Sequence, residues 1–243
     1  YGAMDNGSAN ASMIECARLL AEQRDSLRRG LRLAFWSGHS HARYATSTWY
    51  ADEFWNDLHY LCVAHVNIDS PGGIGATDLS GANTMAETYP LARDLFKQVL
   101  GADLEYERIG RLGDQSFWGP GVPSFYCSIS RQPAEPNPTG IGALTGRGGG
   151  LGWWWHTPDD TMDKLDPAFL ARDCRILLAT VYRLCSDQRL SLDHVRTASE
   201  LLETLQELQK TAGEDLDLSQ LITAVHQLRE SAQKFVGLEF DGP

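Results

Sequence analysis

This chain of 243 residues lacks the sequence signals of several protein classes. A G-x-S-x-G elbow is absent, which disfavours a serine hydrolase. No apolar run approaches the ~18–20 residues of a membrane-spanning helix. The few cysteines are scattered among apolar residues with no C-x-x-C pair, which predicts reduced core cysteines rather than a disulfide framework or a thiolate metal site. The five are Cys16, Cys62, Cys127, Cys174 and Cys185.

Positive charge is also scarce. Lys and Arg total 21 against 32 Asp and Glu, which gives a formal net charge of −11. Nucleic acids and anionic membrane surfaces bind basic faces, so this balance excludes them as the main partners. It favours a site that collects cations. The 42% of hydrophobic residues predicts an ordinary globular protein, with one large domain or one domain and an appendage.

The apolar pattern predicts alternating strands and helices over residues 1–187. Strands are expected at 31–37, which is buried towards its end, and at 61–69, 104–109 and 122–130. Helices are expected at 10–24, 83–100 and 166–186. Asp166 and Pro167 occupy the N-cap and first positions of the last helix. This alternation predicts an α/β fold, a three-layer sandwich with a mostly parallel central sheet.

The composition changes at residue 188. Leucines recur at helical spacing over 191–211 and 217–236, which predicts two amphipathic helices joined near Gly213. Such a pair is typical of a helical hairpin, and its apolar stripe is typical of core packing or a dimer seam. The predicted organisation is therefore an α/β domain over 1–187 and a helical appendage over 188–243.

Three polar residues stand at the ends of predicted elements. Asp5 precedes the first helix, Asp69 closes the strand HVNID, and His156 follows three tryptophans. Two carboxylates and an imidazole on separate elements can converge on a divalent metal such as zinc. Each residue also has a structural interpretation: Asp5 as a helix cap, Asp69 as a turn residue and His156 as a packed core histidine.

In their order and neighbourhoods, these residues resemble the co-catalytic zinc aminopeptidase family that includes glutamate carboxypeptidase and the transferrin-receptor-like proteins. The matching segments over residues 1–187 are GAMDNGSAN, LRLAFW followed by STWYAD, VNIDSPG, DQSFWGPGVPSF and HTPDDTMDKLD. The resemblance implies a peptidase with two zinc ions. It implies that Asp5 bridges the ions, Asp69 binds one of them and His156 binds the other.

Two departures from the family's pattern change the expected site. The family's H-x-D motif supplies its first His ligand and would lie before Asp5, where this chain has only four residues. Because the chain begins at Tyr1 without Met, an upstream portion is expected. The family's adjacent Glu-Glu pair, a general base and a zinc ligand, is replaced by His39 and Ser40. An imidazole can take either role, so His39 is the candidate base and His41 a candidate ligand, with either histidine able to enter the metal shell.

Two functions remain open. The first is a zinc-dependent exopeptidase-like hydrolase of the aminopeptidase or carboxypeptidase type, with Arg43, Tyr126 and Arg147 as candidates for binding a substrate carboxylate or developing oxyanion. The second, suggested by the lost carboxylates, is an inactive homologue that serves as a binding or assembly module. By the same resemblance, residues 188–243 support a homodimer. The compartment is unknown, although the scattered cysteines slightly favour the cytoplasm.

Overall fold

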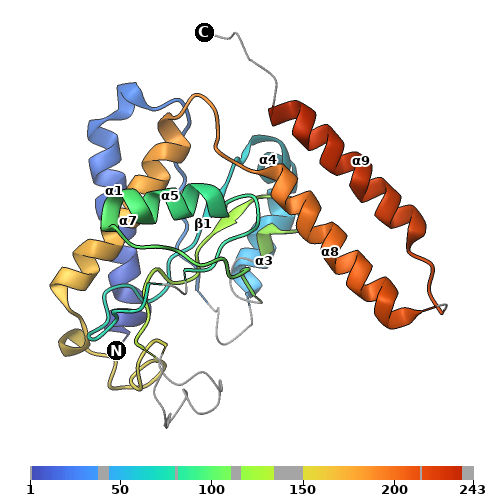
Figure 1. The fold of residues 1–243 in the computed structure, drawn as a ribbon. Coiled ribbons are helices and arrows are strands. Elements are labelled where there is room, and N and C mark those ends of the chain that lie inside the picture. Colours follow the sequence, from blue (N-terminus) through green and yellow to red (C-terminus); the bar gives the residue numbers. More distant parts are fainter. Residues whose placement is uncertain are drawn as a thin grey trace.

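The computed structural model describes residues 2–37, 44–79, 82–110, 116–133, 150–213 and 215–236. Its helices are α1 (Ala9–Glu22), α3 (Ala45–Glu53), α4 (Trp55–Leu61), α5 (Tyr89–Leu100), α7 (Pro167–Ser186), α8 (His194–Ala212) and α9 (Ser219–Val236). Strands β1 (His65–Val66) and β2 (Ser124–Phe125) pair in parallel, with His65 opposite Ser124 (Figure 1). The fold is α/β, which confirms the predicted class.

The helix boundaries follow local capping chemistry. The Asp166 side chain accepts hydrogen bonds from the backbone N–H groups of Ala168 and Phe169, as the N-cap assignment predicted. Helix α5 ends where Gly101 adopts a left-handed φ of 65°, a conformation that glycine takes without steric cost. The predicted helix over 83–100 begins six residues late, at Tyr89, because residues 86–88 form turns.

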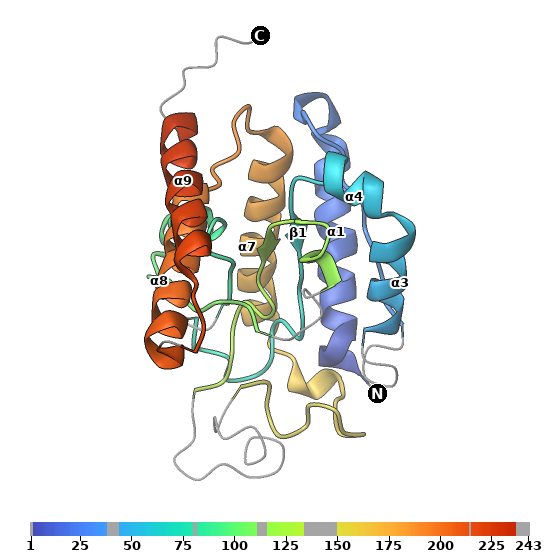
Figure 2. The ribbon, with the colours of Figure 1, turned by 90° about the vertical axis from the view of Figure 1, so that its right-hand side faces the viewer.

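Helices α7 and α1 flank the paired strands in Figure 2. The buried side chains form two clusters. The larger cluster joins α1, α5 and α7 to β2, through residues that include Leu20, Phe96, Ile176 and Phe125. The smaller cluster joins α3 and α4 to the segment before β2 and centres on Leu58. Helices thus lie on both sides of the strands, and Asp69, a candidate site residue, stands three residues after the end of β1.

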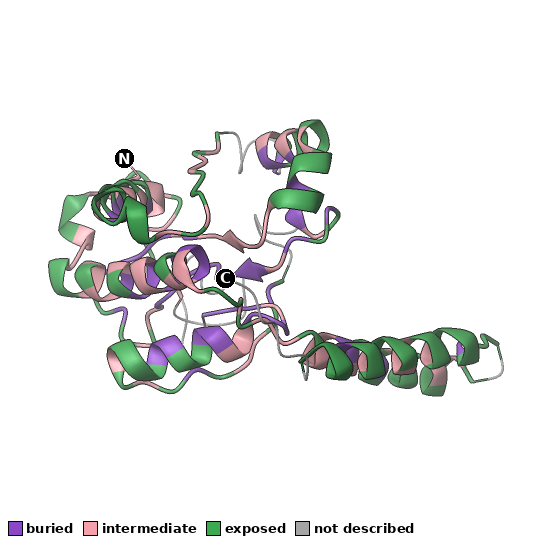
Figure 3. Cartoon of the chain, turned by 90° about the horizontal axis from the view of Figure 1, so that it is seen from above, coloured by how far each residue is buried: buried purple, intermediate pink, exposed green. Residues whose placement is uncertain are grey.

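Helices α8 and α9 form a hairpin that projects from the rest of the protein (Figures 1 and 3). Most of its surface is exposed (Figure 3). At its base, Thr197 donates a hydrogen bond to Glu87, and Glu200 accepts hydrogen bonds from Tyr106 and Arg108. These contacts attach the hairpin to the α/β part through the first turns of α8.

None of the helices in the described residues combines the length and the apolar character that a membrane crossing needs.

Two of the predicted strands are wrong. Residues 31–37 form no strand with any described segment, and Leu31 and Phe35 are 40% and 50% exposed rather than buried. In residues 104–109 only Arg108 forms an isolated bridge, to Thr84. The predicted strands over 61–69 and 122–130 are present but shorter, as β1 and β2. An apolar segment becomes a strand only where a neighbouring segment supplies hydrogen-bond partners, and a local pattern carries no information about that neighbour.

Candidate metal centre

The turn before α1 directs the carboxylate of Asp5 at His156. Residues Ala3–Ser8 form a single wide helical turn, in which Asp5 and Asn6 leave helical backbone geometry and are joined by a cis peptide bond. The Oδ2 atom of Asp5 lies 2.9 Å from Nε2 of His156. Their side chains are 21% and 37% exposed, respectively. A carboxylate and an imidazole from distant parts of the sequence therefore face each other with an open path to solvent.

Asp160 holds the Asp5 segment in place. Its carboxylate is almost fully buried and accepts hydrogen bonds of 2.8 Å from the backbone N–H groups of both Met4 and Asp5. Its backbone carbonyl accepts two more, from Gly2 and Ala3. These contacts fasten the Asp5 turn to the loop that carries His156.

Asn6 joins the same turn to the chain beyond β1. Its side-chain amide donates to the carbonyl of Ile68 and accepts from the N–H of Ser70, both at 3.2 Å. Asp69 lies between these two residues, and its Oδ1 accepts a 2.8 Å hydrogen bond from the Ser70 hydroxyl. These contacts hold the Asp5 turn beside the segment that carries Asp69.

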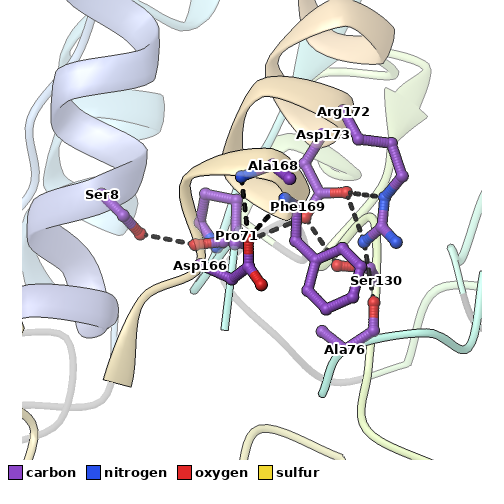
Figure 4. Close-up of polar contacts among 10 residues, drawn as sticks. Ser8, Pro71, Ala76, Ser130, Asp166, Ala168, Phe169, Arg172 and Asp173 are labelled. Carbon is purple, nitrogen blue, oxygen red and sulfur yellow. Dashed lines mark hydrogen bonds and ion pairs between the residues drawn. The ribbon is translucent and has the colours of Figure 1, made fainter. Parts of the chain in front are cut away.

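The loop after Asp69 is held by α7 (Figure 4). The carboxylate of Asp173 accepts hydrogen bonds from the Gly72 N–H at 3.0 Å and the Ser130 hydroxyl at 2.6 Å, and pairs with Arg172 at 2.9 Å. Arg172 also donates to the carbonyl of Ala76 at 2.8 Å. Burial raises the pKa of the Asp173 carboxyl, although Ser130 and Arg172 act in the opposite direction. This buried group was not identified from the sequence.

Strained backbone occurs next to the candidate ligands. Ser70, which follows Asp69, has a φ of 50°, and His156 has a φ of 63°. Non-glycine residues in this left-handed region cost about 1–3 kcal/mol each and are concentrated at functional sites.

The tryptophans before His156 make close contacts. The Trp155 ring stacks on the His156 imidazole with 3.7 Å between ring centroids. Gly152 is required nearby, since a Cβ there would lie 2.5 Å from the Trp154 ring.

The predicted site residues fall into three groups. Asp5 and His156 are in direct contact, and Asp69 belongs to a segment tied to the Asp5 turn. Tyr126 is fully buried in the core, where its hydroxyl pairs with Thr180 at 3.0 Å, so it offers no surface to a substrate. The remaining candidates lie outside the described residues: His39, His41, Arg43 and Arg147.

The side chains of Asp5 and His156 are of the types that bind zinc. Zinc takes carboxylate oxygen and imidazole nitrogen ligands, usually four in all or three with an open position. Asp5 and His156 are a pair of such ligands at mutual contact distance. Across the part of the chain that the structure describes, no cluster of three or more His, Cys, Asp or Glu side chains is suited to a metal ion. A complete zinc shell therefore needs further ligands besides this pair, such as Asp69 or residues beyond the described ones.

Comparison with known families identifies the class of protein. A model described as peptidase family M28 matches residues 1–181, about three quarters of the chain. The chain belongs to this family. The match begins with the Asp5 turn and contains His156 and most of α7. It leaves out α8 and α9. No curated protein gives a significant match to the sequence.

Several solved structures share the fold. An aminopeptidase from Aneurinibacillus sp. strain AM-1 is 22% identical, with a TM-score of 0.54 over 76% of this chain and 40% of that one. A zinc aminopeptidase from Bacillus subtilis is 19% identical, with a TM-score of 0.58 over 78% and 44%. The LapA aminopeptidase of Legionella pneumophila is 19% identical, with a TM-score of 0.54 over 77% and 48%. The chain therefore spans less than half the length of each.

Proposed function

We propose that this chain acts as a zinc-dependent exopeptidase-like hydrolase on peptide substrates, of the aminopeptidase or carboxypeptidase type. The observation that carries the proposal is the pair formed by Asp5 and His156, which come from near the two ends of the family match and face each other at 2.9 Å. Membership of peptidase family M28 supports the reaction class. The zinc aminopeptidase from Bacillus subtilis, which shares the fold, supports the choice of metal.

In this proposal Asp5, Asp69 and His156 would hold zinc, Asp5 as the ligand common to the two ions that the resemblance implies, and His41 would be a further ligand. Zinc in this position would supply Lewis-acid activation of water and of the peptide carbonyl. The chain's own contribution is to orient the ligands. Asp160 fixes the backbone of Asp5, and the stacked indole of Trp155 limits rotation of the His156 ring.

We assign the proton transfers to His39, which stands in the sequence where the resemblance implies a glutamate base. A neutral imidazole nitrogen can accept a proton from the attacking water and return it to the leaving amine near neutral pH. Arg43 and Arg147 are proposed to bind a substrate carboxylate, since a guanidinium binds a carboxylate through two parallel hydrogen bonds. Tyr126 has no part in this proposal because it is buried.

The test is hydrolysis of short peptides with free or blocked ends. Removal of a residue only from peptides with a free amino end would define an aminopeptidase, and dependence on the free carboxyl end would define a carboxypeptidase. We expect a chelator to abolish turnover and zinc to restore it. His39→Ala is expected to lower kcat by about a hundredfold or more. His194→Ala, on the exposed start of α8, is the matched control and is expected to leave turnover unchanged.

The second candidate is a catalytically inactive binding or assembly module on the peptidase fold. It is favoured by the replacement of the Glu-Glu pair by His39 and Ser40 and by the pairing of only two candidate ligands among the described residues. It predicts no turnover at saturating zinc. Chelator-sensitive and zinc-restored hydrolysis would exclude it, whereas unchanged turnover in both His39→Ala and His41→Ala would contradict the proton-transfer assignment.

We further propose a functional division of the chain, with the hydrolase in residues 1–187 and a homodimer contact in residues 188–243. On α9, Leu221, Leu228 and Phe235 recur every seven residues, and each is at least half exposed. A seven-residue apolar repeat is the pattern by which helices pack against other helices. Sedimentation should show a dimer that the double variant Leu221→Lys and Leu228→Lys converts to a monomer; a monomeric wild type would contradict this contact.

A further inference from the structure

Two thiols face each other between helices α1 and α7. Cys16 on α1 is 3% exposed, and Cys174 on α7 is half-buried. Their Sγ atoms are 3.8 Å apart, at hydrogen-bond distance for sulfur. The Cys16 thiol also points at the backbone carbonyl of Cys174, at 3.9 Å. Neither residue has a part in the proposed hydrolase, so this pair is an additional chemical feature of the fold.

We propose that Cys16 and Cys174 are a redox modification site, at which a peroxide converts the two thiols into a reversible disulfide between α1 and α7. A disulfide bond is about 2.05 Å long, so the sulfur atoms must approach by about 1.7 Å from their present separation. The two helices already pack directly against each other. The movement therefore falls within side-chain rotation and small helix shifts rather than a rearrangement of the fold.

The surroundings of the pair favour attack by Cys174. The hydrogen bond with Cys16 lowers the pKa of Cys174 to about 7, with further lowering by Ser12 and opposition from burial, Glu15 and Asp173. The hydrogen bond and burial together raise the pKa of Cys16, which keeps its proton. The thiolate is the form of cysteine that attacks peroxide, so Cys174 is expected to react first, while Cys16 stays protonated until the second step.

The reaction balances in two steps. The Cys174 thiolate attacks one oxygen of hydrogen peroxide, the O–O bond breaks, and the products are the Cys174 sulfenic acid and hydroxide. The Cys16 sulfur then attacks the oxidised sulfur of Cys174 and displaces its oxygen as water. Two thiols lose two electrons and two protons, and one peroxide becomes two water molecules. A dithiol reductant reverses the change by thiol–disulfide exchange.

The disulfide would connect the two segments that build the candidate metal centre. Helix α1 begins at Ala9, directly after the Asp5 turn, and α7 begins at Pro167, after the loop that carries His156 and Asp160. A covalent bond between these helices closes a chain loop of more than 150 residues, and long closed loops restrict the unfolded chain the most. The oxidised protein is therefore expected to melt at a higher temperature than the reduced protein.

The experiment exposes the full chain to a small excess of hydrogen peroxide at neutral pH and then alkylates the remaining thiols under denaturing conditions. We expect the intact mass before alkylation to fall by two hydrogen atoms and the alkylated thiols to fall from five to three. Peptide mapping should find Cys16 and Cys174 in one crosslinked species, which a dithiol reductant separates. Thermal melting of the two forms gives an independent measurement.

Two single variants keep the test specific. In Cys16→Ser the resolving thiol is absent, so peroxide should leave a Cys174 sulfenic acid that dimedone traps. In Cys62→Ser the crosslink should form as in the wild type, because burial raises the pKa of that half-buried thiol. Five alkylatable thiols after peroxide, a crosslink that involves another cysteine, or Cys174 sulfinic acid beside an intact Cys16 thiol would each overturn the proposal. None of these outcomes depends on peptidase activity.

Discussion

The candidate site of the α/β part and the helical hairpin depend on different kinds of internal contact. In residues 1–187 the candidate site depends on hydrogen bonds between residues far apart in the sequence, such as the one that the backbone N–H of Asp5 donates to the Asp160 carboxylate. In the described part of residues 188–243, α8 and α9 contact each other along the hairpin, and their buried side chains are the apolar residues Ala198, Leu202 and Ala232. The hairpin is thus encoded by local periodicity, whereas the site depends on single polar residues. Substitutions in the two regions should therefore act differently.

The largest effect is expected at Asp160. Asp160→Ala leaves the buried N–H group of Met4 and the part-buried N–H group of Asp5 without their acceptor, and two hydrogen bonds to a charged group contribute about 3–6 kcal/mol to stability. We expect the free energy of unfolding, measured by urea denaturation, to fall by that order. Asp159→Ala, its exposed neighbour, should change it by no more than about 0.5 kcal/mol. Equal effects of the two substitutions would contradict the holding role of Asp160.

A comparable substitution on the hairpin should act through packing alone. Leu202 is 6% exposed, and Leu202→Ala should lower the free energy of unfolding by about 2–5 kcal/mol. Its neighbour Leu201 is 44% exposed, and Leu201→Ala should cost about 0.5 kcal/mol or less in the monomer. Neither substitution should alter zinc binding. Loss of zinc in Leu202→Ala would show that the hairpin and the site are coupled.

The pH dependence of stability should distinguish the regions further, because the buried Asp173 belongs to the α/β part. Burial raises its pKa in the folded state, so between the unfolded and folded pKa values the folded protein binds more protons. The contribution of Asp173 to stability therefore falls as pH rises through this window. Denaturation at several pH values should show this decrease in the wild type and a flatter profile in Asp173→Asn. A difference of opposite sign would contradict the role of burial.

The smallest effect is expected where the two regions meet. Glu200→Gln weakens the hydrogen bonds from Tyr106 and Arg108, and we expect a loss of about 1 kcal/mol. Hydrogen exchange should increase in the first turns of α8 and remain unchanged at the Asp5 turn. Glu203→Gln, on an exposed position of the same helix, is the control. Increased exchange at the Asp5 turn would show that the hairpin supports the site.

Helices were predictable from the sequence because their signals are local. The expected ranges 10–24, 166–186 and 217–236 agree with α1, α7 and α9 to within a few residues. The N-cap at Asp166 was correct in its details, since the capping oxygen and the N–H groups it accepts from lie within one helical turn. Strands were predicted poorly because their stability depends on a partner segment that the local pattern does not name.

The candidate site was predictable only in part. Motif order identified Asp5 and His156, which the structure brings together, but gave no sign of how they are held. Asn6, Asp160 and Asp173 act through contacts with residues that are distant in the sequence. The sequence alone does not distinguish a buried aspartate that accepts backbone hydrogen bonds from an exposed one, as the neighbours Asp160 and Asp159 illustrate.

The most direct test of the metal-centre account is zinc content per chain by elemental analysis, after dialysis against excess zinc and then against zinc-free buffer. The wild type should retain zinc in stoichiometric amount. His156→Ala and Asp5→Asn should retain much less, while Asp159→Asn should match the wild type. Circular dichroism must show that all four proteins are folded. A folded wild type that holds no zinc, or folded His156→Ala and Asp5→Asn variants that hold as much as the wild type, would contradict the account.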